Sequence, residues 1–148
     1  MTPLPEFRKP TTFEALLNRA FGFLIGLGIG PAHIYLLQVR GRKSGKLFST
    51  PVDLLPFKGT LYLVAPRGRT QWVRNAEAAG EITLKKGSKV QKYRLRPIVN
   101  ADKPEILKAY LDNFKAEVQR YFPVPAGSPV QDFAGIVESY PAFELLTY

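Results

Sequence analysis

Cysteine is absent from this sequence, and histidine and tryptophan each occur once. Disulfides, thiolate metal sites and cysteine nucleophiles are therefore excluded. The single histidine, His33, cannot form a multi-histidine metal centre, and its apolar surroundings favour a packed or turn histidine. The sequence predicts no metal site, and it identifies no catalytic residue.

Long hydrophobic runs are also missing. The uncharged run over residues 20–32 has thirteen residues, fewer than the roughly 17 to 25 that a membrane-spanning helix needs. Upstream, apolar residues recur at helical spacing, and Thr11 with Glu14 fits a capping box, so an apolar helix is predicted from Phe13 onward. We expect this helix to be buried against the rest of the chain, with contact to a membrane surface as the alternative.

No signal-peptide cleavage site of the A-x-A kind follows the apolar run, so a cytoplasmic protein is expected. If the apolar helix instead contacts a membrane, the protein would be peripheral to the inner face of the cell membrane. The length of 148 residues with 45% apolar residues predicts one folded domain. Within it, residues 1–32 form an N-terminal extension and helix, and residues 33–148 form a barrel with flanking helices.

Acidic residues are outnumbered, with 12 against 21 basic ones, and the net charge of +9 predicts a polyanionic partner. Nucleic acid, anionic lipid and a phosphorylated small molecule all fit that charge. The basic residues gather in segments 40–46 and 85–96, the second of which also fits an ordinary solvated face. Aromatic residues are not interleaved with the basic ones as in a stacking platform, so no nucleic-acid partner is expected.

The chain divides into short β-branched and aromatic runs separated by turn residues. Strands are predicted over residues 34–40, 48–57, 60–66, 81–86, 89–99 and within 141–148. Helices are predicted over 70–80, 102–121 and 132–140. About six mostly antiparallel strands in short hairpins, with helices between and around them, predict an α+β barrel and disfavour a doubly wound fold.

The segment G-R-K-S-G-K, residues 41–46, is a candidate anion site. Its two glycines permit a tight turn, and Arg42, Lys43, Ser44 and Lys46 provide donors for charge-assisted hydrogen bonds. The spacing differs from that of the nucleotide P-loop, because the lysine lies between the glycines. Taken alone, the segment also fits an ordinary basic turn.

Two further segments add to this pattern. Thr50-Pro51 follows the basic turn, and A-P-R-G-R-T-Q-W-V-R-N occupies residues 65–75. The combination of G-R-K-S-G, T-P and W-x-x-N resembles the deazaflavin-dependent nitroreductase family, a branch of the flavin-reductase-like split β-barrels. The resemblance extends from about residue 13 to residue 96.

This resemblance implies a split β-barrel of the FMN-binding and pyridoxamine-phosphate-oxidase type. It implies an oxidoreductase that binds reduced coenzyme F-420, a deazaflavin, and transfers hydride to a small organic or lipid-like acceptor such as a quinone, an enone or a nitro compound. The alternatives are a relative that binds FMN, and a noncatalytic protein that binds lipid or fatty acid. Members of the wider group often form homodimers, so a homodimer is expected from the resemblance.

The resemblance also implies roles for individual residues. The basic turn would hold the phosphate and acidic tail of the coenzyme, Thr50 and Pro51 would lie along its ring, and residues 65–68 would offer backbone groups. Trp72 and Asn75 would stabilise the short helix beneath. The predicted coenzyme-binding set is Arg42, Lys43, Ser44, Lys46, Thr50, Pro51, Ala65, Pro66, Arg67, Gly68, Trp72 and Asn75.

One departure concerns Phe48, which stands where members often carry a further arginine, so one contact to the tail is expected to be missing. The stretch between Gly68 and Trp72 is also shorter than in the best-known nitroreductases, so reduction of nitro drugs is not transferred to this chain. Tyr140, Tyr148 and solvent are equal candidates for the proton donor.

Overall fold

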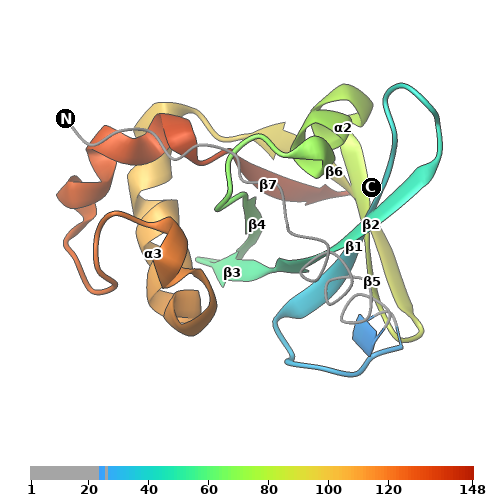
Figure 1. Ribbon diagram of the computed structural model, residues 1–148, viewed down its shortest axis with the longest axis horizontal. Coiled ribbons are helices and arrows are strands. Elements are labelled where there is room, and N and C mark those ends of the chain that lie inside the picture. The colour runs from blue at the N-terminus through green and yellow to red at the C-terminus, as the bar shows by residue number, and fades with distance from the viewer. Residues whose placement is uncertain (1–23, 26) are drawn as a thin grey trace.

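The computed structural model describes Leu24, Ile25 and residues 27–148 (Figure 1). Most of the apolar helix predicted from Phe13 therefore lies outside the described residues. Leu24 and Ile25 are helical, and Ile25 is fully buried in a small cluster with Ile34 and Leu36. Within the described part of the chain, none of the helices has the length and apolar character needed to cross a bilayer.

Seven strands form one antiparallel sheet, in the order β2-β1-β5-β6-β7-β4-β3. The strands are β1 (Ile34–Arg40), β2 (Leu47–Asp53), β3 (Leu55–Phe57), β4 (Thr60–Val64), β5 (Glu81–Lys86), β6 (Lys89–Pro97) and β7 (Ala142–Thr147). The helices are α2 (Gln71–Ala79) and α3 (Lys103–Val118), with 3-10 segments at Asn100–Asp102, Gln119–Tyr121 and Val130–Ser139.

The predicted strand over residues 48–57 is two strands, which is why the sheet has seven strands where about six were expected. β2 pairs with β1 at one edge of the sheet, and β3 pairs with β4 at the other edge. Only Leu54 separates them in the sequence. Since consecutive Cα atoms lie about 3.8 Å apart, the two edges must meet at this residue, and the sheet curls into a half-barrel.

Both prolines of this stretch occupy edge strands. Pro51 is in β2 and Pro56 is in β3, and each of these strands has one neighbour in the sheet. An edge strand tolerates the loss of one backbone donor, whereas a central strand does not. The β3–β4 hairpin turns at Lys58 and Gly59, as predicted, and both residues have positive φ, 50° and 78°, as the turns favoured in tight hairpins require.

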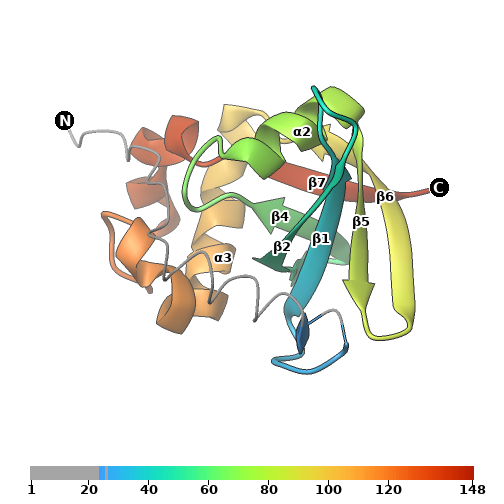
Figure 2. The same ribbon diagram turned by 45° about the vertical axis from the view of Figure 1, so that its right-hand side comes forward.

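Two apolar clusters lie on either side of the curled sheet. The inner one contains Leu37, Leu63, Ile82 and Leu84 from three strands, together with Ala76 of α2. Figure 2 shows α2 across one end of the sheet, and α3 with its neighbouring 3-10 segments on the side of β3 and β4. The outer cluster joins α3 and its neighbouring 3-10 segments to the sheet and is rich in aromatic residues.

The predicted helices differ from the observed ones in their ends and type. α2 begins and ends as predicted, with Gly80 in the left-handed conformation at φ 73° after its last residue. α3 ends at Val118, and the final predicted turn is a 3-10 segment. The segment predicted as a helix over residues 132–140 is a 3-10 segment instead, and it runs over Val130–Ser139 between Pro129 and Pro141.

Leu37 tests the inner cluster, because it is fully buried in β1, whereas Leu47 in the neighbouring β2 is 50% exposed. Leu37→Ala should lower the free energy of unfolding by about 2–5 kcal/mol through lost burial and a residual cavity. Leu47→Ala should change it by less than about 1 kcal/mol. Denaturant unfolding measures both variants, and equal effects would contradict this packing.

Candidate functional site

A cleft of about 630 Å³ lies between β2, the loop after β4 and the C-terminal part of α3. This volume falls within the range of about 300–1,000 Å³ typical of ligand sites. The strand β2 contributes five consecutive residues, 49–53, to its wall. The cleft therefore follows the strand whose outer edge has no partner among the described strands.

Seven of the predicted coenzyme-binding residues line this cleft, although they come from two separate parts of the chain. Two belong to β2, four to the loop after β4, and one to α2. They are Thr50, Pro51, Ala65, Pro66, Arg67, Gly68 and Trp72. The remaining five, Arg42, Lys43, Ser44, Lys46 and Asn75, do not line it.

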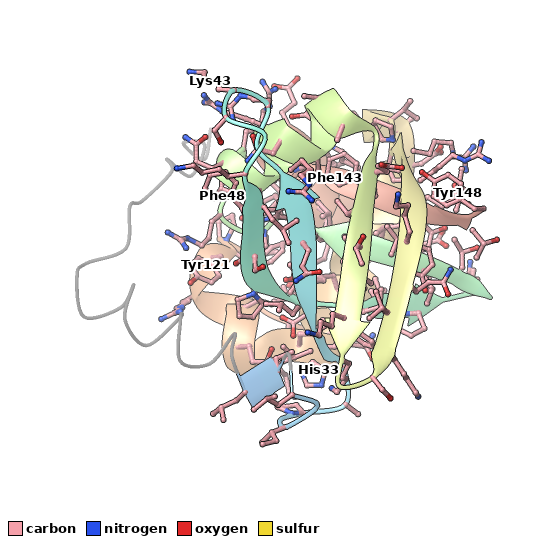
Figure 3. The ribbon with its side chains drawn as sticks, turned by 90° about the vertical axis from the view of Figure 1, so that its right-hand side faces the viewer. His33, Lys43, Phe48, Tyr121, Phe143 and Tyr148 are labelled. Carbon is pink, nitrogen blue, oxygen red and sulfur yellow. The ribbon has the colours of Figure 1, made fainter. Side chains whose placement is uncertain are left out.

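The basic turn over residues 41–46 joins β1 to β2, beyond the end of the cleft. The backbone N–H of Gly41 donates to Lys46 O at 2.8 Å, and that of Gly45 donates to Gly41 O at 3.0 Å. Gly45 has φ 71°, which favours glycine. The turn is compact, and Lys43 and Lys46 are exposed at its surface. Figure 3 shows Lys43 at the tip of this turn.

Asn75 holds this turn against α2. Its side chain is buried, and Oδ1 accepts hydrogen bonds from the Arg42 backbone N–H at 3.1 Å and from Arg42 Nη1 at 2.8 Å. Arg42 Nη1 also donates to Gln71 Oε1 at 3.0 Å. The expected role of Asn75 in stabilising its own helix is therefore too narrow, because its amide fixes the position of the basic turn.

Phe48 packs against the same turn from β2. A Cβ atom added to Gly41 would lie 2.6 Å from Phe48 Cε2, so only glycine permits this approach. Phe48 remains 48% exposed, close to the start of the cleft-lining residues. At the position where the family resemblance implied an arginine, this chain has an exposed aromatic ring.

The loop after β4 forms another part of the cleft wall. Gly68 has φ 83°, and its N–H donates to Ala65 O at 3.2 Å, which turns the chain towards the start of α2. Thr70 occupies the N-cap of α2, and its buried Oγ1 has no hydrogen-bond partner in the described structure. Thr70 and Gln71 line the cleft but were not predicted. Both lie between the predicted residues Gly68 and Trp72, and this position was the signal that could have identified them.

At the opposite end of the cleft, three ionisable side chains meet. His33 Nε2 lies 2.7 Å from Glu117 Oε1 and 3.3 Å from Asp53 Oδ1. The three residues come from the segment before β1, from α3 and from the end of β2, and Asp53 and Glu117 line the cleft. We call them the carboxylate cluster.

Backbone and ring contacts fix this cluster. The N–H of Leu54 donates to His33 O at 2.9 Å, which holds His33 beside the junction of β2 and β3. The imidazole stacks on the Phe114 ring at 4.9 Å. Phe114 is also where α3 departs from helical geometry, at φ −120° and ψ 25°. Glu117 therefore belongs to the last turn of α3, after this break.

Burial, followed by the hydrogen bond with Glu117 and the charge of that neighbouring carboxylate, raises the pKa of Asp53 to about 8. Burial also raises the pKa of Tyr110, a second cleft residue, well above its usual value, with contributions from Asp53 and Glu117. The sequence showed no sign of this cluster, because its members are separated by up to 84 residues. The potential ligand atoms lie within 4.8 Å of one another, so the absence of a metal site stays a prediction.

The tyrosines considered as proton donors lie elsewhere. Tyr140 is fully buried, its hydroxyl donates to Tyr121 O, and burial raises its pKa to about 12. The Tyr148 hydroxyl donates to Glu81 Oε2. Neither tyrosine lines the cleft.

The second basic segment lies on β5 and β6, outside the cleft. Several of its side chains are engaged within the protein. Lys92 pairs with Glu81 at 3.6 Å, Arg96 pairs with Glu144, and Lys86 donates to Ile34 O at 2.9 Å. These contacts favour the interpretation of this segment as a solvated face of the sheet.

Residues 12–124 match the model of a protein family described as F-420H(2)-dependent quinone reductase. A solved structure described as a domain-swapped dimer is 21% identical, with a TM-score of 0.55, and the match covers 90% of this chain and 92% of that one. A structure of an F-420-H2 dependent reductase is 21% identical, with a TM-score of 0.51, over 77% of this chain and 94% of that one. No curated protein matches the sequence.

A third solved structure, of a putative pyridoxamine 5'-phosphate oxidase from Listeria innocua, is 8% identical, with a TM-score of 0.50, over 77% of this chain and 82% of that one. At such identities the likeness concerns the fold. It confirms the split-barrel prediction, with the strand count corrected to seven.

The role of Asn75 can be tested by removing its amide. Asn75→Ala leaves the Arg42 N–H without its partner and should lower the free energy of unfolding by about 1–3 kcal/mol. It should also speed amide hydrogen exchange across residues 41–46. Gln71→Ala, which removes only an exposed side-chain contact, should leave that exchange nearly unchanged, and protection equal to wild type in Asn75→Ala would contradict the assignment.

The raised pKa of Asp53 predicts a pH-dependent cost to stability. Between about pH 4 and pH 8 the unfolded state has released this proton and the folded state retains it, so stability falls as pH rises. Asp53→Asn should remove this dependence. Between pH 5 and pH 8 its free energy of unfolding should rise by at least about 2 kcal/mol relative to that of wild type, since one pKa unit corresponds to about 1.4 kcal/mol. Denaturant unfolding at both pH values measures the effect, with Asp132→Asn as an exposed control.

Proposed function

Since this chain belongs to the F-420H(2)-dependent quinone reductase family, we propose that its cleft binds the ring of reduced coenzyme F-420 and that the electron acceptor is a quinone. The family makes the chain an F-420-dependent oxidoreductase. The observation that supports this use of the cleft is the convergence in it of seven residues predicted to contact the coenzyme.

The coenzyme supplies hydride chemistry when bound, and the protein supplies binding and orientation. Thr50 and Pro51 line the cleft along β2, and residues 65–68 line it from the loop after β4, where their backbone groups are available to a flat ring. Trp72 lines the cleft and also packs on Phe143, with the ring centroids 6.2 Å apart, so a bound ring would meet a rigid side chain.

The anionic tail of the coenzyme would extend to the basic turn. That turn lies outside the cleft, at the beginning of β2, so the ring and the tail occupy different parts of the protein surface. Arg42 is engaged with Asn75 and Gln71, which makes it the residue that positions the turn. Lys43 and Lys46 are exposed and provide the point charges for phosphate and carboxylate groups.

The quinone would occupy the remainder of the cleft, towards the C-terminal part of α3. Ile34, Val118 and Tyr121 line that part and present apolar and aromatic surface. An uncharged, flat acceptor fits such a lining. A homodimer, a cytoplasmic location and contact with a membrane surface stay predictions.

A direct test is titration with oxidised coenzyme F-420, followed by the fluorescence of Trp72, the chain's one tryptophan, which lines the cleft. Quenching at micromolar or lower coenzyme is expected, with FMN titrated in parallel. Oxidation of the reduced coenzyme is then followed with a simple naphthoquinone. Binding of FMN alone would contradict the cofactor assignment.

The basic turn gives a charge-matched test of tail binding. Lys43→Ala combined with Lys46→Ala should weaken coenzyme binding at least tenfold, since hydrogen bonds to charged groups contribute on the order of 1.5–3 kcal/mol each. Lys85→Ala combined with Lys89→Ala removes the same charge from the second basic segment and should change the dissociation constant less than about twofold. Equal weakening in the two pairs would show a general charge effect and would overturn the tail site.

A further inference from the structure

We propose that the Asp53 carboxyl is the proton donor to the reduced quinone, and that Glu117 and His33 connect it to solvent. This inference rests on the proposed function, because it assigns the proton step at the same cleft. Reduction of a quinone requires an electron pair and two hydrogens, of which the coenzyme provides the pair with one hydrogen. The second hydrogen needs an acid within reach of the acceptor.

Asp53 has the position that this step requires. Pro51 and Asp53 both line the cleft and are two residues apart in β2, paired with Leu36 and Ile34 of β1. Side chains two residues apart in a strand point to the same face, roughly 7 Å from each other. If the ring lies along Pro51, the Asp53 carboxyl is within reach of an acceptor bound beside that ring.

The surroundings of Asp53 favour a retained proton. Its side chain is 11% exposed, and the Glu117 carboxylate beside it has the same sign of charge. Burial and Glu117 together raise the pKa of Asp53 to about 8, so the carboxyl is protonated at neutral pH. The titratable or charged groups nearest this end of the cleft, from the elements around it, are His33, Arg67, Lys86, Tyr110, Glu117, Arg120 and Tyr121.

The remaining members of the carboxylate cluster are exposed enough to exchange protons with water. The side chains of His33 and Glu117 are 33% and 38% exposed, and they contact each other at 2.7 Å. Figure 3 shows His33 at the end of the β1–β2 hairpin opposite Lys43. The proton route therefore opens at the end of the cleft farthest from the proposed tail site.

The step is balanced in atoms and charge. The quinone gains two electrons and one hydrogen from the coenzyme, which is oxidised and releases its ring proton to solvent. The second O–H bond of the hydroquinone forms as the O–H bond of Asp53 breaks. The Asp53 carboxylate then regains a proton from water through Glu117 and His33.

A proton route fits the observed distances better than a metal ion does. Tetrahedral zinc ligands at about 2.0–2.2 Å from the ion must lie roughly 3.3 Å from each other. The contact of 2.7 Å between His33 Nε2 and Glu117 Oε1 is a direct hydrogen bond instead. The same contact is what proton transfer between the two side chains requires.

The test is the pH dependence of naphthoquinone reduction by the reduced coenzyme, between pH 5.5 and pH 9.5. Wild-type kcat should fall above about pH 8, as Asp53 ionises. Asp53→Asn should bind the coenzyme within about threefold of wild type, lower kcat at least tenfold and lose this alkaline limb. Glu117→Gln should retain this alkaline limb but shift it to lower pH, because the loss of the neighbouring negative charge lowers the pKa of Asp53. If Glu117 had only a structural role, the substitution would not move the limb.

Asp132→Asn, an exposed change in the 3-10 segment Val130–Ser139, is the matched control and should leave kcat and its pH profile unchanged. If wild type reduces the quinone and Asp53→Asn retains kcat and the limb, the proton-donor assignment alone is wrong. If wild type binds the coenzyme and reduces no quinone, the quinone assignment fails and this inference fails with it. Stoichiometric Zn²⁺ binding that Asp53→Asn abolishes, with activity lost in chelator, would overturn the proposal in favour of a metal site.

Discussion

The passage of the chain from β2 to β3 through Leu54 is the constraint on which the rest of this structure depends. These two strands lie at opposite edges of the seven-stranded order, and one residue joins them. The sheet must therefore bend until its edges meet, and the inner apolar cluster fills the space enclosed. The same junction places Asp53 beside His33, whose carbonyl accepts the Leu54 N–H.

All parts of the proposed site consequently lie along β2 or directly before it. The basic turn precedes β2, Thr50 and Pro51 lie in its middle, and Asp53 is its last residue. Tail site, ring wall and proton donor thus follow one another in sequence along about 20 Å of extended backbone. Because a paired strand is stiff, the sheet sets the distance between the ring wall and Asp53, and the hydrogen bonds of Asn75 hold the basic turn beside the start of β2. The rigid spacing provides the orientation that hydride transfer requires.

The sequence predicted most elements because local signals and tertiary structure agree in them. The turn at Lys58-Gly59 and the glycine after α2 are examples, since each depends on a positive φ at one place. The break at Leu54 was missed because an apolar residue within an apolar run carries no local signal. The carboxylate cluster was missed because only tertiary folding unites a residue before β1, the end of β2 and the last turn of α3. The family resemblance pointed to seven residues that line the cleft. It assigned Asn75 to the stabilisation of α2, whereas the structure shows that Asn75 also binds Arg42 of the basic turn.

The outer edge of β2 has a further consequence. Among the described strands only β1 pairs with β2, so the other edge of β2 presents backbone donors and acceptors with which another chain could pair. The exposed side chains of Leu47 and Phe48 add apolar surface near that edge. Pro51 interrupts that edge, since it lacks an N–H group and its ring hinders a continuous ladder. Pro51, which lines the cleft, therefore also makes β2 a poorer template for strand addition by another chain.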